Sequence, residues 1–288
     1  MALLRNVGIT LEMIKWEHSV FALPFALSGA MLAAAGLPAW SKVFWIVVCM
    51  VTARSAAMAF NRWADAALDA ANPRTAVRAI PSGLLSRNFV AGFTIFMSLA
   101  FILAASQLNR TTLLLSPVAL AIVLLYSYTK RFTRWSHLVL GLALGIAPAA
   151  AWIAIRGTLD PRIVVLTLAV LFWVGGFDVL YACQDMAHDR GSGLNSIPQT
   201  WGVRAAFWIA RAMHLIMLGL LCWLLKLFGL NAIAWVGVAA VALLLLYEHL
   251  IISPKDLRRL NAAFFTMNGI ISLVFFLFVA AALLMPKL

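Results

Sequence analysis

Long apolar runs recur along almost the whole chain, and they limit its fold more than any other feature. Hydrophobic residues make up 64% of the 288 residues and charged residues only 11%, which exceeds what a soluble domain of this length needs. A helix of about 20 apolar residues crosses the hydrocarbon core of a bilayer. The alternation of apolar and polar residues that a membrane β-barrel would need is missing from the sequence. The chain is therefore predicted to be an all-α integral membrane protein.

Nine of the apolar runs are long enough to be membrane spans. Their approximate limits are 19–36, 42–60, 89–108, 112–128, 137–156, 162–182, 206–228, 231–252 and 262–285. Ahead of them, the segment from Leu4 to Trp16 is predicted to be a short amphipathic helix at the membrane interface. Glu12 and Lys15 interrupt the apolar core that a cleavable signal peptide would need.

The basic residues gather on one side of the predicted spans. A net charge of +12 suggests an anionic partner, but the placement of the charges argues against nucleic acid. With the N-terminus in the cytoplasm, the basic residues on that side are Arg5, Lys15, Arg62, Arg74, Arg78, Arg87, Lys130, Arg131, Arg134, Arg190, Arg204, Lys255, Arg258 and Arg259. Those near the other side are Lys42, Arg110, Arg156, Arg162, Lys226 and Lys287. The asymmetry follows the positive-inside rule, and nine spans then put the C-terminus outside.

Two short clusters of aspartates end apolar runs, where carboxylates are costly. The chain has ten acidic residues, and the clusters hold Asp65, Asp69, Asp178, Asp185 and Asp189. The Asp65–Asp69 pair recurs 120 residues later as Asp185–Asp189, and Tyr181 then stands at the position of Asn61. A single aspartate at a helix end is usually solvated, but two such pairs favour function. This recurrence is compatible with an internal repeat of groups of helices.

The spacing of the clusters suggests a metal. Residues four apart on a helix lie on the same face. The resulting polar stripes are Asn61, Asp65 and Asp69 in the first cluster and Tyr181, Asp185 and Asp189 in the second, with Asp178 one turn earlier. Two facing carboxylate stripes would repel each other unless a cation lay between them. Mg²⁺ is the natural choice, because it prefers oxygen and is commonly shared between carboxylates and substrate phosphates. Basic residues beside the stripes would hold the remaining phosphate charge.

Other polar residues have a simpler explanation beside the functional one. Arg54, seven residues before Asn61, extends the first stripe into the membrane or else snorkels to the interface. Lys130 and Arg131 bind phosphate or only anchor the topology. His137, like His214 and His249, is expected to be an interfacial residue.

Three segments of the chain carry a family resemblance. They are Asn61-x3-Asp65-x3-Asp69 followed by Arg74-Thr75-x2-Arg78-x2-Pro81-Ser82-Gly83, then Tyr126-x-Tyr128-x-Lys130-Arg131, and finally Tyr181-x3-Asp185-x3-Asp189. Together they resemble the signatures of the UbiA family of intramembrane prenyltransferases, over nearly the whole chain. The resemblance is greatest to polyprenyltransferases that act on 4-hydroxybenzoate and to related enzymes of quinone pathways. Asn195 is a departure, since other members often carry a basic residue or His there.

The resemblance implies a fold and a reaction. The fold would be a bundle of about nine transmembrane helices around a central cavity, in one domain covering 1–288. The reaction would be Mg²⁺-dependent transfer of a polyprenyl group from polyprenyl diphosphate to a small aromatic acid. The leading acceptor is 4-hydroxybenzoate, with dihydroxynaphthoate second, in ubiquinone- or menaquinone-type quinone biosynthesis. We expect a multi-pass protein of a bacterial inner membrane, in contact with lipid but not with nucleic acid, with a cytoplasmic N-terminus and active site.

The resemblance also implies roles for residues. The metal ligands would be Asp65, Asp69, Asp185 and Asp189, with Asn61 as a neutral ligand to metal or phosphate. The diphosphate would contact Arg78, Lys130 and Arg131. The acceptor's carboxylate would meet Arg54 or Lys15. Its hydroxyl would be oriented, or its ring proton accepted, by Asp178 or Tyr181.

Two other classes of protein use carboxylates in membranes. CDP-alcohol phosphotransferases need D-G-x2-A-R ahead of G-x3-D-x3-D in a single cluster, and this chain has two separate clusters. A cation-coupled transporter would carry its carboxylates near mid-membrane, whereas these lie at helix ends. Within the same fold, prenylation of haem, chlorophyll or a lipid stays open.

Overall fold

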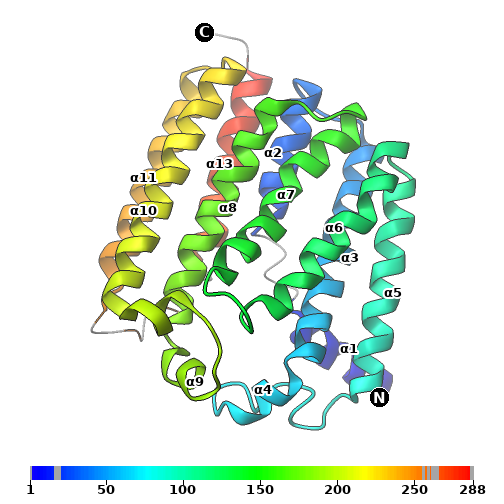
Figure 1. The fold of residues 1–288 in the computed structure, drawn as a ribbon. Helices are drawn as coiled ribbons and strands as arrows, with labels where there is room; N and C mark the ends of the chain where they lie inside the picture. Colours follow the sequence, from blue (N-terminus) through cyan, green and yellow to red (C-terminus); the bar gives the residue numbers. More distant parts are fainter. Residues whose placement is uncertain (1, 16–20, 255–256, 258–259, 261–265, 286–288) are drawn as a thin grey trace.

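The protein is a bundle of helices (Figure 1), several of which are long and apolar enough to cross a membrane. The structure, a computed structural model, describes residues 2–15, 21–254, 257, 260 and 266–285. The helices are α1 (Ala2–Ile14), α2 (Leu23–Ala34), α3 (Trp40–Ala64), α4 (Ala66–Ala71), α5 (Arg87–Ser106), α6 (Arg110–Thr129), α7 (Ser136–Arg156), α8 (Pro161–Ala182), α9 (Met186–Gly191), α10 (Ile197–Phe228), α11 (Ala232–Ile251) and α13 (Asn268–Leu284).

Each of the nine predicted spans corresponds to one apolar helix, so the predicted fold class is confirmed. Seven of these helices are long and apolar enough to cross a bilayer, and the other two, α2 and α13, are shorter. Two predicted boundaries were wrong. The first span begins at Leu23 rather than at 19, because Pro24 opens the helix. The seventh begins at Ile197 rather than at 206, and its backbone leaves the helical conformation at Gly202 (φ 79°, ψ 166°).

Small residues let the central helices pack closely. Helix α7 lies against α2, α6 and α8, and α8 lies against α10. Along α7, the Cα atoms of Gly141 and Gly145 face backbone carbonyls of α8, where an added Cβ would clash with Leu171 and Thr167. Gly29 of α2 faces the backbone of Pro148 in α7 in the same way. Such close approach drives helix association in a membrane, where hydrophobic burial between helices contributes little.

The largest cluster of buried apolar side chains lies between α2, α7, α8, α10, α11 and α13, and a smaller one lies between α2, α3, α5 and α7. In the largest cluster the Phe25 ring packs against Trp173 and Phe275, with ring centroids 5.0 and 5.3 Å apart. In the most apolar 18-residue stretch of each helix, 72% of α8 is buried and only 11% of α6. Helix α8, which carries Asp178 and Tyr181, is therefore the most buried of the seven long apolar helices in the described part of the chain.

The polar loops gather at one end of the bundle. Figure 1 shows α1, α4 and α9 at that end, whereas α13 finishes at the opposite end. The predicted N-terminal helix is present as α1, and its Met13 and Ile14 pack against Ala59 and Leu85. Helices α1, α4 and α9 and the helical junctions next to them therefore lie at the same end of the bundle.

Candidate active site

The first aspartate motif lies at a break between two helices. Helix α3 stops at Ala64, and Asp65 (φ −95°, ψ 5°) joins it to the short α4. The amide of Asp65 still donates to Asn61 O at 2.9 Å, and that of Asp69 to Asp65 O at 2.8 Å. The four-residue spacing thus survives the break, and Asn61 Nδ2 donates to Asp65 Oδ2 at 3.2 Å. The predicted placement of Asn61 and Asp65 on the same face is confirmed.

The second motif repeats this junction. Helix α8 stops at Ala182, and Asp185 (φ −100°, ψ 0°) is the residue before the short α9. The amide of Asp189 donates to Asp185 O at 2.8 Å, the same distance as in the first motif. The similarity between the two aspartate motifs therefore includes their backbone geometry.

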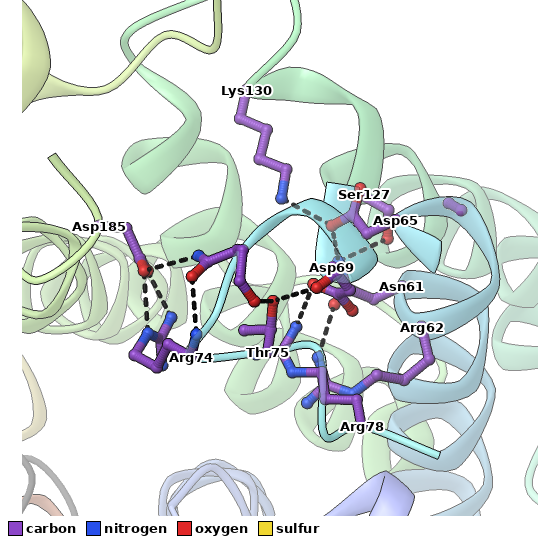
Figure 2. A network of polar contacts seen from close by, with 12 residues as sticks. Asn61, Arg62, Asp65, Asp69, Arg74, Thr75, Arg78, Ser127, Lys130 and Asp185 are labelled. Carbon is purple, nitrogen blue, oxygen red and sulfur yellow. Dashed lines mark hydrogen bonds and ion pairs between the residues drawn. The ribbon is translucent and has the colours of Figure 1, made fainter. Parts of the chain in front are cut away.

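The carboxylates of the first motif are buried and paired with cations (Figure 2). Asp65 is 1% exposed and Asp69 5%. Asp65 lies 2.7 Å from Lys130 Nζ and 2.9 Å from Arg131 Nη2, and Asp69 lies 2.7 Å from Arg78 Nη1. Buried carboxylates need such partners to remain charged. Lys130 and Arg131 are thus part of the site, beyond any role in topology.

The loop after α4 connects the two motifs. Arg74 Nε donates to Asp185 Oδ1 at 2.9 Å, and Arg74 Nη1 donates to Tyr181 OH at 3.2 Å. Asn72 Nδ2 adds a bond to Asp185 Oδ1 at 3.3 Å, and its Oδ1 accepts the Arg74 amide. Burial alone would lower the pKa of Arg74, but the bonds to Asp185 outweigh it and raise the pKa. No role was predicted for Asn72 or Arg74, although both follow the motif in a polar turn.

The second loop is fixed at two points. Ser196 Oγ donates to Asp189 Oδ2 at 3.0 Å. Burial raises the pKa of Asp189, and the nearby charge of Asp185 adds to this, whereas the Ser196 bond opposes it. Asn195 donates from its backbone to Lys130 O at 2.7 Å and from its side chain to Arg131 O at 3.3 Å. Asn195, where the chain departs from the family pattern, therefore anchors the loop to the segment that holds Lys130.

The carboxylates are not arranged as two bare facing stripes. Within the described ranges, no three acidic, His or Cys side chains are close enough to share an ion, because Arg74 and Lys130 lie against the aspartates. One oxygen nevertheless fits a hard cation: Asp69 Oδ2 is buried and has no hydrogen-bond partner in the described part of the chain. An unmet buried carboxylate oxygen is costly and suits Mg²⁺. The assignment of metal ligands stays a prediction.

A cavity of about 1240 Å³ opens beside the motifs. Of the predicted site residues, it is lined by Lys15, Arg54, Asn61, Arg78, Asp178 and Tyr181. The unpredicted Arg62 and Tyr126 join them. From this polar head the cavity continues between apolar side chains of α3, α6 and α7 as far as Leu108 and Leu159, next to the opposite helix ends.

Lys15 reaches the cavity through an unusual backbone conformation. It follows α1 with a positive φ of 50°, and its amide donates to Glu12 O at 3.1 Å. Glu12 lines the cavity beside it. The end of α1 therefore forms part of the polar head.

Two of the histidines that were expected at the interface are buried. His137 is 2% exposed, and its Nδ1 lies 2.7 Å from Asp178 Oδ2. Its Nε2 accepts the amide of Ile197 at 3.3 Å. His214 is also buried, with its Nδ1 2.9 Å from His249 Nε2. The side chains of His137 and His214 are therefore buried inside the protein, each with a polar partner on another helix.

Known proteins share this sequence pattern. The UbiA prenyltransferase family matches residues 22–285. A 4-hydroxybenzoate octaprenyltransferase of Cupriavidus necator is 32% identical over 247 residues, which are 85% of this chain and 85% of that protein. One of Burkholderia multivorans is 30% identical over 91% of this chain and 92% of its own length.

Solved structures share the fold. The apo structure of a UbiA homolog from Aeropyrum pernix superposes with a TM-score of 0.83 at 32% identity, covering 90% of this chain and 96% of that one. A UbiA homolog from Archaeoglobus fulgidus bound to DMAPP and Mg²⁺ has a TM-score of 0.72 at 17% identity, over 95% and 98% of the two chains. With two aspartate motifs that each contribute a residue to the wall of an apolar cavity, Asn61 and Tyr181, and a family match over residues 22–285, the chain belongs to the UbiA prenyltransferase family.

Proposed function

We propose that this protein transfers a polyprenyl group from polyprenyl diphosphate to the ring of 4-hydroxybenzoate, in quinone biosynthesis. One observation carries the proposal: the polar end of a long apolar cavity is lined by Asn61, Arg74 and Arg78, and these residues contact the aspartates Asp65, Asp185 and Asp69. A prenyl diphosphate has the same division into an anionic head and an apolar tail. The relatives named 4-hydroxybenzoate octaprenyltransferase, at about 30% identity, support the choice of acceptor.

The diphosphate would bind at the aspartate motifs. Mg²⁺ would be held by Asp65, Asp69, Asp185 and Asp189, with Asn61, and when bound it neutralises the leaving diphosphate. The unmet Asp69 Oδ2 and the Mg²⁺ of the Archaeoglobus homolog support this. Arg78, Lys130 and Arg131 are already beside the carboxylates. They would supply charge-assisted hydrogen bonds to phosphate oxygens.

The tail would lie in the apolar part of the cavity. This part is lined by side chains such as Ile46, Ala119 and Leu144. Exclusion of water from it would protect the allylic cation that forms when the C–O bond of the donor breaks.

The acceptor would sit at the polar head, beside the reacting end of the tail. Arg54 and Lys15 line the cavity there, and a guanidinium binds a carboxylate in two parallel hydrogen bonds. Asp178 and Tyr181 line the same region from α8. A new C–C bond forms at the ring carbon ortho to the hydroxyl, and Asp178 would accept the proton that this carbon loses.

One assay tests the proposal. Membranes containing the protein are incubated with one labelled prenyl diphosphate and a panel of aromatic acids, and the product is identified by its mass. We expect prenylated 4-hydroxybenzoate, and no product in excess chelator. Product only with dihydroxynaphthoate or another acid of the panel would identify a different acceptor. Absence of both product and released diphosphate with every acceptor would contradict a prenyltransferase and favour a cation-coupled transporter. Full turnover in excess chelator would contradict the requirement for a divalent metal.

A further inference from the structure

We propose that His137 is a positioning residue that holds Asp178 as the proton acceptor and ties it to the loop of the second aspartate motif. The inference rests on the proposed function. It assigns a role to a buried side chain that faces neither the diphosphate ligands nor lipid: His137 is 2% exposed and stands at the start of α7.

The two contacts of His137 determine where its proton lies. A backbone N–H can only donate, so the 3.3 Å contact with the Ile197 amide makes Nε2 the acceptor. In a neutral imidazole the other nitrogen then carries the hydrogen. Nδ1–H therefore donates to Asp178 Oδ2 at 2.7 Å. Asp178 is held as an acceptor, which is the state that a base needs.

Asp178 faces the place where the acceptor would bind. It lines the cavity together with Tyr126, Tyr181 and Arg54, and its side chain is 17% exposed. Because His137 holds Oδ2, the other oxygen, Oδ1, is the one left for the substrate. A general base must reach the proton it removes with good geometry, and a single fixed rotamer of Asp178 provides this.

The same histidine connects Asp178 to the diphosphate side of the site. Ile197 is the first residue of α10 and follows Ser196, which caps the helix by accepting the Gln199 amide at 3.3 Å. Ser196 Oγ also donates to Asp189 Oδ2 at 3.0 Å. A continuous set of contacts thus runs from Asp189 through Ser196, Ile197 and His137 to Asp178. The position of the second loop, which would close on the diphosphate, thereby sets the position of the base.

The balanced reaction shows what a misplaced base would do. In normal turnover the donor C–O bond breaks and the diphosphate leaves with the electron pair. The C–C bond to the ring forms, and the ring proton passes to the Asp178 carboxylate while its bonding electrons return to the ring. Without a placed base, water competes for the allylic cation and gives prenyl alcohol and a proton. Diphosphate is then released without aromatic product.

The decisive measurement is aromatic product formed per diphosphate released, in matched variants of the full-length protein. His137→Asn keeps a donor at the Nδ1 position, and His137→Gln places its amide only near the Nε2 position. We expect His137→Asn to stay within about three-fold of the wild-type ratio and His137→Gln to fall about ten-fold or more, as expected when a base contributing 10²–10⁴-fold is displaced. The KM for prenyl diphosphate should change less than about two-fold, because no diphosphate contact is removed.

Controls separate positioning from stability. His214→Phe removes a second buried histidine that contacts His249 and Trp173 O, away from the cavity lining, and should leave the product ratio unchanged. Asp178→Asn should lower the ratio as His137→Gln does, and the double variant should be no worse. An unchanged ratio in His137→Gln, or equal loss in the Asn and Gln variants, would overturn the inference. A wild-type protein that makes no aromatic product would instead overturn the proposed function.

Discussion

Asp65 shows how single residues balance charge at this site. Its carboxylate is buried against Lys130 and Arg131, and the half-buried Asp185 is held by Arg74. Removing one partner of a buried pair usually leaves a costly uncompensated charge. Here the cations are about one-third exposed, so water can solvate them when the aspartate is neutralised. Neutral variants should therefore remain folded.

Asp65→Asn and Asp185→Asn should each reduce turnover at least about 100-fold, since each removes a charge from the proposed diphosphate and metal head. Diphosphate release is the quantity to measure. Asp160→Asn is a matched control, because Asp160 pairs with Arg162 at the other end of α8, and it should retain full activity. A near-normal kcat in either motif variant would show that its carboxylate binds neither the metal nor the diphosphate. Asp178→Asn should be milder, with diphosphate release retained.

Arg54 is predicted to select an acid over a neutral phenol. It lies seven residues before Asn61, about 10 Å deeper along α3 at 1.5 Å per residue, and it lines the cavity. Loss of a charge-assisted bond of about 1.5–3 kcal/mol should raise the KM for 4-hydroxybenzoate about 10- to 150-fold in Arg54→Leu. The KM for prenyl diphosphate should change little. Equal losses for both substrates would place Arg54 in the diphosphate site, and equal use of a neutral phenol by the wild type would contradict a carboxylate contact.

At the scale of elements, the crossing of α7 and α8 positions the acceptor side of the site. Helix α7 carries His137 and α8 carries Asp178, so their 2.7 Å contact depends on how closely the helices approach. Gly141 and Gly145 provide that approach, because their missing Cβ atoms leave room for carbonyls of α8. A change in helix spacing would therefore reach the site without altering any site residue.

Gly141→Ala should lower the free energy of unfolding by about 1–3 kcal/mol, the range for overpacking a close contact. The new Cβ would meet the carbonyl oxygen of Leu171, which belongs to the backbone and cannot turn away. Gly92→Ala in α5 is the matched control. Nothing lies within 4 Å of its Cβ position, and alanine favours a helix. The melting temperatures of both variants are measured by thermal unfolding in detergent, and that of Gly141→Ala should be the lower. Equal melting temperatures would show that α7 and α8 can move apart to accept the new methyl group.

At the scale of the whole molecule, the bundle combines a packed side with a side that lines a cavity. Helix α8 lies within the packed core, whereas α3 and α6 turn many side chains toward the cavity or outward. Both aspartate motifs stand at the same end (Figure 1). Five basic residues at helix ends mark the other end, namely Lys42, Arg110, Arg156, Arg162 and Lys226.

The motif end is predicted to face the cytoplasm, by the positive-inside rule. In a variant lacking Cys49, Cys183 and Cys222, single cysteines are placed at Ser82, at Ser192 or at Thr158, which are all exposed. An impermeant thiol reagent added outside intact cells should label only Thr158→Cys. Labelling of Ser82→Cys and Ser192→Cys with protection of Thr158→Cys would invert the topology. Labelling of all three after membrane permeabilisation shows that each cysteine is reactive.

The sequence by itself determined the nine apolar helices, the spacing of the motifs and the family. These features depend on local hydrophobicity and on helical periodicity, which neighbouring residues encode. Asn61 and Asp65 are four residues apart, so their contact follows from the helix alone. Wrong boundaries arose where local geometry intervened, as at Gly202, whose positive φ lets a helical turn precede the predicted span.

Only the tertiary structure decided the pairings between distant residues. Arg74 meets Asp185 across 111 residues, Asn195 meets Arg131 across 64, and His137 meets Asp178 across 41. No periodicity in the sequence links such positions. They meet because glycines set the distance between α7 and α8 and because loops fold back over buried charges that need partners. The motifs could therefore be predicted from the sequence, whereas the chain of hydrogen bonds from Asp189 to Asp178 depends on how the helices cross.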